Sequence, residues 1–217
     1  MPLKYVTNAV GMLLSNSYVL YDETSREAII IDAGDDAWKI LESIQENKLK
    51  VRGIYATHCH FDHVLAVDDL RDTLGCEFYI HPGDKEILES MQEHTKMFLG
   101  IDVPAPPKPD GFVDEGQVIK IGQYEVKVLH TPGHSPGSVC YHVENLLFSG
   151  DTLFRASIGR TDGPGGDARK IVESIQMKLF TLPDDINVLP GHGPATSIGY
   201  EKEYNPFVGK NGLLSKP

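Results

Sequence analysis

The sequence predicts a mixed α/β protein, and three observations support this prediction. Apolar residues switch repeatedly between the alternation typical of strands and the spacing typical of helices. No internal repeat or low-complexity tract interrupts this succession, and three short apolar runs end directly at polar, chemistry-bearing motifs. The order indicates sheets with largely sequential strands and helices on their outer faces. The length of 217 residues suits a single domain over residues 1–217.

The first half of the chain alternates between predicted strands and helices. The N-terminal stretch alternates like a strand, and four apolar runs predict further strands at 13–22, 27–34, 51–58 and 77–81. Apolar residues at helical spacing predict helices at 37–49, 63–74 and 84–100. Gly75 follows the second of these helices and is expected to end it. The proline-rich stretch 103–111 must be a loop.

The second half begins with strands and then adds a helix. Alternating or continuous apolar runs predict strands at 117–122, 124–131, 137–143 and 145–150. A helix is expected over 167–182, where Ile171, Ile175, Leu179 and Leu182 form one apolar stripe. The segment 187–194, NVLPGHGP, predicts a short buried strand that ends in a turn.

Composition narrows the choice of partners and compartment. The net charge of −11 works against binding to nucleic acid or anionic membranes, because both need clustered Lys and Arg. The sequence has no apolar run of about 18 residues, and its N-terminal apolar stretch is too short for a signal peptide. Cys59, Cys76 and Cys140 form no C-x-x-C pair and suggest no disulfide framework, so we expect a cytoplasmic protein. Whether it forms a homo-oligomer is left open.

The stretch HCHFDH concentrates metal-ligating side chains at the end of a predicted strand. His58 and His60 are two residues apart, so their side chains share a face of an extended chain. Asp62 and His63 can project beside them if the chain turns at Phe61. Core packing gives no reason to cluster imidazole and carboxylate groups at a strand end, whereas metal binding does.

Three further ligand-type residues follow other apolar runs, each beside a glycine. They are His134 in TPGHSPGS, Asp151 in LLFSGDTLF and His192 in LPGHGP. A catalytic metal needs about three protein ligands and an open position, so the seven residues suffice for two metals if one carboxylate bridges them.

We therefore assign the seven residues to two divalent metal ions. The first metal receives His58, His60 and His134, the second receives Asp62, His63 and His192, and Asp151 bridges them. Histidine and carboxylate ligands suit zinc, iron or manganese, and zinc is the metal we expect. Two such ions about 3.5–4 Å apart form a known hydrolytic device.

The motifs resemble those of a known family. H-x-H-x-D-H, G-H, S-G-D and G-H occur in this order over residues 58–192 and are similar to the ligand motifs of the metallo-β-lactamase superfamily. The resemblance implies an α/β fold built as a four-layer αββα sandwich, with a dinuclear metal site at one edge of the two packed sheets. True β-lactamases of the superfamily typically lack the aspartate that corresponds to Asp151.

Within the superfamily, TPGHSPGSVCY, FSGDTLFRASIGRTDGPGG and EKEYNPF resemble the short bacterial and archaeal branch of glyoxalase II, or hydroxyacylglutathione hydrolase. The resemblance implies hydrolysis of S-lactoylglutathione or a related hydroxyacyl thioester by a metal-bridging hydroxide. Asp62 and Asp151 are then the candidate catalytic carboxylates, with Asp151 orienting the nucleophile. Typical members hold glutathione with a basic C-terminal helical region, whereas only 25 residues follow His192 here, with Lys202, Lys210 and Lys216 scattered among them.

Two further residues are expected at the substrate. Arg160 would pair with a substrate carboxylate, the alternative being an ordinary surface salt bridge. Tyr141 would line the cleft, the alternative being a strand residue of the core. Cys59 alternates with two ligands and should point away from them.

A second function also agrees with the sequence. The GRTD segment also resembles persulfide dioxygenases of the same superfamily, which are oxidoreductases that use one iron held by two histidines and an aspartate. The corresponding residues here are His58, His134 and Asp151.

Overall fold

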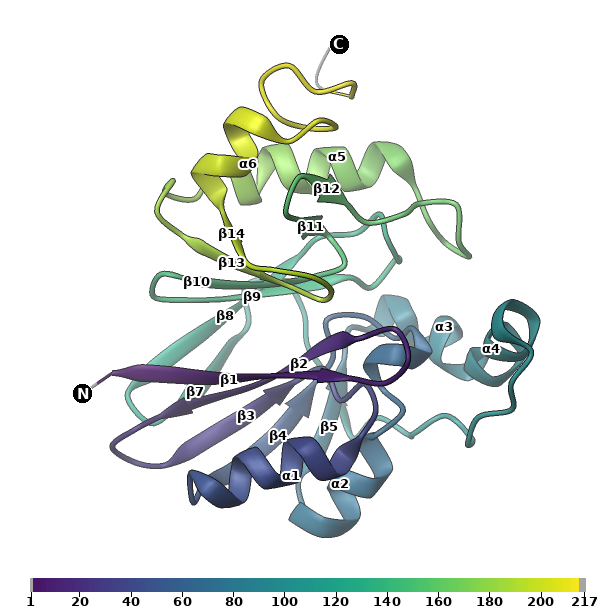
Figure 1. Ribbon diagram of the computed structural model, residues 1–217, viewed down its shortest axis with the longest axis vertical. Coiled ribbons are helices and arrows are strands. Elements are labelled where there is room, and N and C mark those ends of the chain that lie inside the picture. Colours follow the sequence, from purple (N-terminus) through teal and green to yellow (C-terminus); the bar gives the residue numbers. More distant parts are fainter. Residues whose placement is uncertain (1, 215–217) are drawn as a thin grey trace.

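A computed structural model describes residues 2–214 and consists of four layers, with two β-sheets packed face to face and helices on both outer surfaces (Figure 1). The mixed α/β class and the αββα sandwich are therefore confirmed. The first half of the chain forms the lower sheet in Figure 1 and the second half forms the upper sheet. The two sheets are thus built from separate halves of the sequence, and strands within each follow sequence order.

The first sheet has six strands. In spatial order they are β1 (Leu3–Val10), β2 (Ser15–Asp22), β3 (Glu27–Ile31), β4 (Lys50–Tyr55), β5 (Glu77–Ile80) and β6 (Gly111–Phe112). β1 to β3 pair antiparallel, and β3 to β6 pair parallel. Helices α1 (Ala37–Glu46) and α2 (Val67–Leu74) cover its outer face (Figure 1).

The second sheet also has six strands. In spatial order they are β14 (Thr196–Ser197), β13 (Asn187–Pro190), β10 (Leu146–Gly150), β9 (Val139–Val143), β8 (Tyr124–His130) and β7 (Val118–Ile121). β10 and β13 pair parallel and the remaining pairs are antiparallel. Helices α5 (Ala168–Met177) and α6 (Ile198–Tyr204) cover the outer face, and β11 (Leu153–Phe154) pairs with β12 (Ser157–Ile158) in a separate hairpin.

Three apolar layers hold the sandwich together. In β3, Ile30 packs under the helices of the first sheet while Ile29 and Ile31 face the second sheet, because successive strand residues point to opposite faces. Both faces are buried, which explains why this strand is a continuous apolar run instead of an alternating one. On the other side, the predicted stripe of α5 packs on the second sheet through Ile171 and Ile175.

Two helix predictions need correction. The second helix begins at Val67 instead of residue 63, because the backbone of the preceding residues bonds to another loop: Ala33 N donates to His63 O, and Ala66 N donates to Ala33 O. The stretch 84–100 forms two helices, α3 (Lys85–Glu89) and α4 (Met91–Leu99). Ser90 separates them, and its hydroxyl donates to the backbone oxygen of Glu86 at 2.7 Å, a bond typical of residues that weaken helices.

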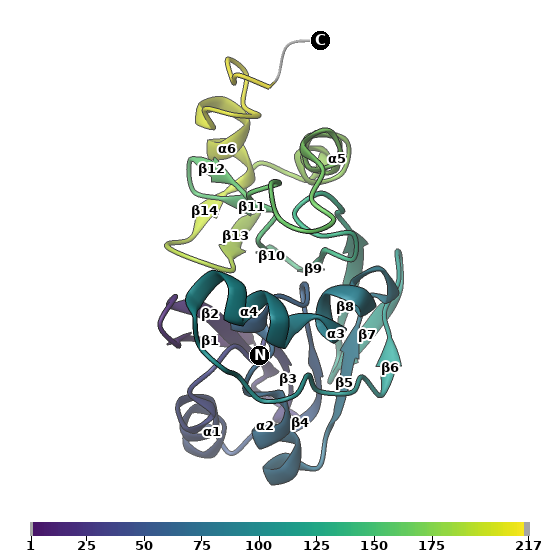
Figure 2. The same cartoon turned by 90° about the vertical axis from the view of Figure 1, so that its right-hand side faces the viewer.

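The fold gathers several loops at one edge of the sandwich. The loops after β4, β8, β10 and β13 meet there, between the two sheets, and α3 and α4 lie beside them (Figure 2). Among residues 2–214, no helix is long and apolar enough to cross a membrane.

Candidate metal centre

The structure brings the seven predicted ligands together at this edge. His58, His60, Asp62 and His63 come from the loop and short 3₁₀ turn after β4. The second sheet supplies the other three, since His134 follows β8, Asp151 follows β10 and His192 follows β13. The ligand-type atoms form a first group of His58, His60 and His134 and a second group of Asp62, His63 and His192, each within 4.8 Å. His58, His63 and Asp151 form a third set within the same distance, which overlaps both groups.

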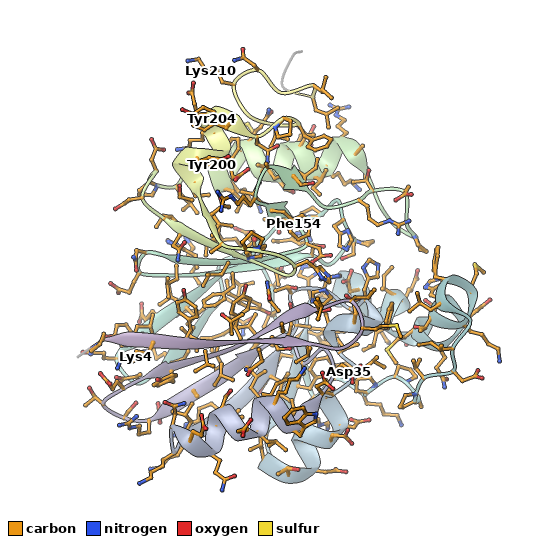
Figure 3. All side chains as sticks on the ribbon, in the orientation of Figure 1. Lys4, Asp35, Phe154, Tyr200, Tyr204 and Lys210 are labelled. Atoms are coloured by element: carbon orange, nitrogen blue, oxygen red, sulfur yellow. The ribbon has the colours of Figure 1, made fainter. Side chains whose placement is uncertain are left out.

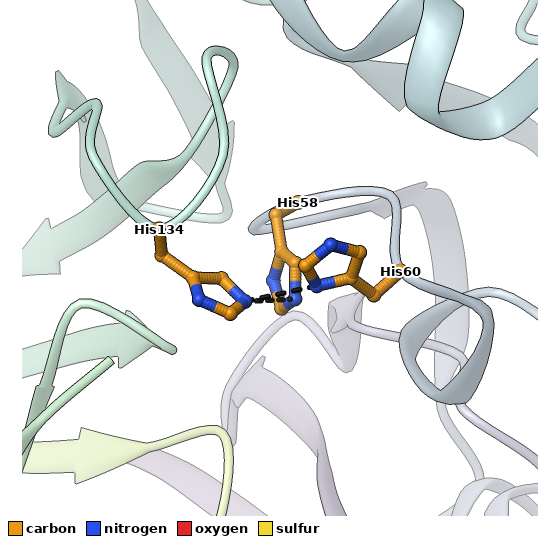
Figure 4. A group of neighbouring side chains, drawn as sticks. All are labelled: His58, His60 and His134. Carbon is orange, nitrogen blue, oxygen red and sulfur yellow. Dashed lines mark hydrogen bonds between the residues drawn. The ribbon is translucent and has the colours of Figure 1, made fainter. Parts of the chain in front are cut away.

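The first group consists of three imidazoles from both halves of the molecule. His134 Nε2 lies 2.9 Å from His60 Nδ1 and 3.3 Å from His58 Nε2 (Figure 4). The three rings stand nearly perpendicular to one another, with interplanar angles of 80–89°. Their nitrogens therefore point at one common volume, as expected for three ligands of one ion.

The second group combines a carboxylate with two imidazoles. His192 Nε2 lies 3.2 Å from Asp62 Oδ2 and 3.3 Å from His63 Nε2. His63 Nε2 lies 3.5 Å from the same carboxylate oxygen. This arrangement matches the set predicted for the second metal.

Asp151 lies between the two groups. Its Oδ1 is 3.5 Å from His63 Nε2, and its Oδ2 is 3.6 Å from both His134 Nε2 and His192 Nε2. The carboxylate thus reaches both groups, which is the position of a bridging ligand. Gly191 permits the approach, because a Cβ added there would lie 2.2 Å from Asp151 Oδ1.

Hydrogen bonds on the far side of the rings determine which nitrogen faces the centre. His63 Nδ1 contacts Asp32 Oδ2 at 2.9 Å and therefore carries the proton. Thr57 Oγ1 donates to the same oxygen at 2.8 Å, so it can only accept from His58 Nδ1 at 3.1 Å. Asp32 thereby orients one histidine of each group, directly and through Thr57.

The remaining Nε2 ligands are oriented by backbone carbonyls. His134 Nδ1 donates to Arg160 O at 2.8 Å, and His192 Nδ1 donates to Leu13 O at 3.2 Å. With the protons held on Nδ1, the Nε2 atoms of both rings present lone pairs to the centre.

The residues fit a bound cation. Lone pairs on neighbouring nitrogens would face one another at about hydrogen-bond distance, which is repulsive unless a positive ion lies among them. In addition, Asp151 Oδ1 is buried and has no hydrogen-bond partner among the described residues. A buried carboxylate oxygen without a donor is costly, and a bound metal ion would provide the missing partner.

The electrostatics differ between the two groups. Burial lowers the pKa of His60 to about 3 and holds the pKa of His58 well below its usual value, so both are neutral and able to bind metal. Burial also lowers the pKa of His63, but Asp62, Asp32 and Asp151 outweigh it and raise this pKa to about 10. The second group therefore attracts positive charge strongly, and a metal ion would displace the proton.

Asp84 joins two loops that carry predicted ligands. This residue is fully buried, and its Oδ2 accepts from Cys59 N at 2.9 Å and from Ser135 Oγ at 2.8 Å. Its Oδ1 accepts from Gly137 N at 2.6 Å. Cys59 lies between His58 and His60, and Ser135 follows His134, so Asp84 fixes the two loops relative to each other. As predicted, Cys59 itself is buried in the core.

These supporting residues were not predicted from the sequence. Asp32 and Asp84 are single aspartates outside the ligand motifs, and so is Ser15, whose hydroxyl donates to Asp62 Oδ2 at 2.9 Å. One signal was present for Asp32, which follows the apolar run of β3 much as Asp151 follows that of β10. Nothing comparable marks Asp84, which precedes an ordinary helix.

A cleft of about 410 Å³ opens above the predicted ligands, and the two substrate predictions differ in outcome there. Arg160 lines the cleft, with its guanidinium 5.9 Å from the centroid of the Phe98 ring. Tyr141 does not line it: the side chain is fully buried between the sheets, and its hydroxyl donates to Ala56 O at 2.8 Å. The prediction for Tyr141 was wrong, because the residue faces inward on the central strand β9.

Comparison with known proteins decides the family. A model of the metallo-β-lactamase superfamily matches residues 10–192, which include all seven predicted ligands. The chain belongs to the metallo-β-lactamase superfamily. The fold, the ligand motifs and this match together support a metal-dependent hydrolase of that superfamily.

Two similar proteins within the superfamily cover nearly the whole chain. A probable metallo-hydrolase of Bacillus subtilis, YqgX, is 38% identical, with 95% of this chain and 98% of that protein covered. The hydroxyacylglutathione hydrolase GloC of Haemophilus influenzae is 37% identical, with 89% and 92% covered.

Solved structures agree with the fold. BLEG-1, a B3 metallo-β-lactamase, superposes with a TM-score of 0.88 at 39% identity, over 94% of this chain and 99% of that one. TTHA1623 in a di-iron-bound form gives a TM-score of 0.84 at 38% identity, over 93% and 98%. ETHE1 from Myxococcus xanthus gives 0.78 at 28% identity, over 96% and 84%.

Proposed function

We propose that this protein hydrolyses thioesters, with S-lactoylglutathione or a related hydroxyacyl thioester as substrate and two divalent metal ions, preferably zinc, as cofactors. The observation that carries the proposal is the complete set of seven ligands, six of them around Asp151, with an open cleft above them. The similarity to a hydroxyacylglutathione hydrolase over most of both chains supports the substrate class.

The bound metals would supply Lewis acidity and lower the pKa of water, so that a nucleophile exists near neutral pH. Asp151 Oδ1, which has no donor among the described residues, points toward the same volume as the histidines. A carboxylate in this position orients a water molecule and accepts its proton. Asp62 is held in place by the Ser15 hydroxyl and the ring of His192.

Lys202 and Lys210, the C-terminal lysines among the described residues, already have acidic partners and do not line the cleft. Lys202 binds Asp184 at 2.6 Å, and Lys210 pairs with Glu203 at 3.7 Å. Figure 3 shows Lys210 near the C-terminal end of the molecule, well separated from α4. Lys216 lies outside the described residues. Arg160 is therefore the cation that we propose for a substrate carboxylate.

A persulfide dioxygenase remains the second candidate. His58, His134 and Asp151 lie close together, as one iron would require, and the likeness to ETHE1 favours this alternative. Such an enzyme would leave His60, Asp62, His63 and His192 without a role, although these four residues complete a second set of ligands. The hydrolase therefore explains more of the site.

The deciding experiment compares three activities of the same protein, purified without added metal. Hydrolysis of S-lactoylglutathione is measured by release of free thiol, oxygen consumption is measured with glutathione persulfide, and β-lactam hydrolysis is measured as a further control because of the similarity to BLEG-1. We expect thioester hydrolysis and no oxygen uptake. Oxygen uptake without thioester hydrolysis would establish the dioxygenase instead.

A further inference from the structure

The cleft above the predicted metal ligands has an apolar wall. Helix α4 supplies Met91, Phe98 and Leu99, and Ile87 of α3 and Leu13 of the β1–β2 turn extend the same surface. Figure 2 shows α4 in front of the edge where the two halves meet. The wall and the floor of the cleft are continuous, since His60, Asp62 and Asp151 line the same space.

The cleft offers little to a highly charged substrate. Apart from the predicted metal ligands, the described residues that line it include one arginine, Arg160, one further imidazole, His94, and no lysine, aspartate or glutamate. The guanidinium of Arg160 already makes two bonds to Asp162, at 2.7 and 3.1 Å, and faces the Phe98 ring. The net charge of −11 on the whole chain also disfavours a carrier with several negative charges.

Phe98 is available to a ligand and is not part of the core. Phe98 is 57% exposed although it lines the cleft, and the Arg160 guanidinium lies 5.9 Å from the centroid of its ring. Met91, by contrast, is 2% exposed and forms the fixed base of the wall. An apolar group entering the cleft would remove the exposed surface of Phe98 from water, which is favourable by about 25 cal/mol per Å².

We propose that the cleft selects thioesters that carry an extended apolar group, a medium-length alkyl chain or an aryl ring, which lies along α4 and ends at Phe98. This inference rests on the proposed thioester hydrolysis and specifies its substrate class. Lactate, with its short polar acyl group, would leave the apolar wall unoccupied. The apolar group can belong to the acyl part or to the thiol, and two substrate series distinguish these sources.

The first series keeps glutathione as the thiol and compares the acetyl, butyryl and hexanoyl thioesters. The second keeps the acetyl group and compares ethanethiol, butanethiol and hexanethiol esters. Butyryl and hexanoyl esters differ little in intrinsic reactivity, so a difference in kcat/KM between them reports binding to the wall. Complete burial of one methylene is worth about a fourfold gain, and we expect at least about fivefold between the two in one of the series.

The variant Phe98→Ala tests where the selectivity originates. We expect it to reduce the hexanoyl-to-butyryl ratio, or the matching thiol ratio, to less than about twofold. Met97→Ala is the matched control, because Met97 is the neighbouring residue of α4, is 70% exposed and does not line the cleft. This control should retain the wild-type ratio and the wild-type activity.

The outcomes separate the two proposals. Equal kcat/KM values for all esters within both series would overturn the apolar specificity while thioester hydrolysis stands. The same holds if Phe98→Ala leaves the ratio of kcat/KM between the six-carbon and four-carbon esters unchanged. Preference for S-lactoylglutathione over every longer ester would overturn it as well. Absence of hydrolysis with all of these esters would instead overturn the proposed function and, with it, this inference.

Discussion

Single residues outside the ligand motifs determine how the ligands point. Asp84 accepts three hydrogen bonds from the loops that carry His58, His60 and His134. Asp32 plays the same part for His63 directly and for His58 through Thr57. Such outer partners hold the ring orientations that metal binding requires, so their loss should weaken the metal site without removing a ligand.

The substitution Asp84→Ala is expected to lower metal affinity by about 10- to 100-fold, because three donors lose their acceptor and the two loops are no longer fixed. Asp84→Asn should have a smaller effect, since one oxygen remains. Metal affinity is measured by competition with a chromophoric chelator. Glu89→Gln is the control, because Glu89 is exposed and its carboxylate lies 4.0 Å from Lys85 Nζ, a weak surface pair. Unchanged affinity in Asp84→Ala would show a purely structural role.

Asp151 and Arg160 should respond very differently to removal. Asp151→Ala removes the group that lies between both ligand sets, and we expect kcat for thioester hydrolysis to fall by at least about 100-fold. Arg160→Ala should raise KM by less than about tenfold and leave kcat nearly unchanged, because the guanidinium is exposed and is paired with Asp162. Near-full activity of Asp151→Ala in steady-state assays would exclude the bridging role.

The ligands could be predicted from the sequence, whereas their supports could not. HCHFDH contains four metal-ligating side chains in six residues, and core packing does not explain such a cluster. His134, Asp151 and His192 each follow an apolar run and a glycine. The role of Asp84 could not be predicted, because it depends on the fold, which brings the backbone N–H groups of Cys59 and Gly137 to its two carboxylate oxygens. The prediction that Tyr141 lines the cleft was wrong for a different reason. The strand itself was predicted correctly, but which of its faces meets the cleft depends on how the two sheets pack.

At the level of elements, the sequence predicted whether a segment is a helix or a strand better than it predicted the first and last residues of that segment. Most strands and helices lie where periodicity placed them, since both sheets bury alternating or continuous apolar runs. The first residue of α2 and the break between α3 and α4 at Ser90 were not predicted. Both depend on hydrogen bonds that compete with the backbone hydrogen bonds of a continuous helix. Gly75 was predicted correctly as the end of α2 and has a φ of 64°.

The positive φ of Gly75 leads to a quantitative prediction for the stability of Gly75→Ala. Gly75→Ala should destabilise the protein by about 1 kcal/mol, because an L-residue is strained in the left-handed region, and should lower the thermal midpoint by about 2–4 °C. A Cβ there would meet no atom within 4 Å, so no clash contributes. Gly75→Asn should cost less, and Asp72→Ala on the same exposed turn should change little. Equal midpoints for Gly75→Ala and the wild type would refute the argument.

At the level of the whole molecule, the metal ions would connect the two halves. His58, His60, Asp62 and His63 belong to the first sheet's loops, while His134, Asp151 and His192 belong to the second. Without a cation, two carboxylates and five imidazoles would meet in a largely buried space. Metal binding to the native state should therefore contribute to folding stability as well as to catalysis.

Removal of metal by a chelator is expected to lower the thermal midpoint. Saturation at a thousand times the dissociation constant stabilises by about 4 kcal/mol, which for a chain of this size corresponds to about 10 °C. The shift is measured by calorimetry before and after dialysis against the chelator and should reverse when zinc is added back. In Asp151→Ala the chelator should have a smaller effect. An equal thermal midpoint of the wild-type protein before and after the chelator would contradict the claim that bound metal connects the two halves.

The most direct test of the central claim is the metal content of the wild-type protein, determined by elemental mass spectrometry after purification without chelators and with saturation by one divalent metal. Asp151 and the six ligands arranged around it predict two ions per chain. A reproducible content of one ion per chain, or none, would contradict the account.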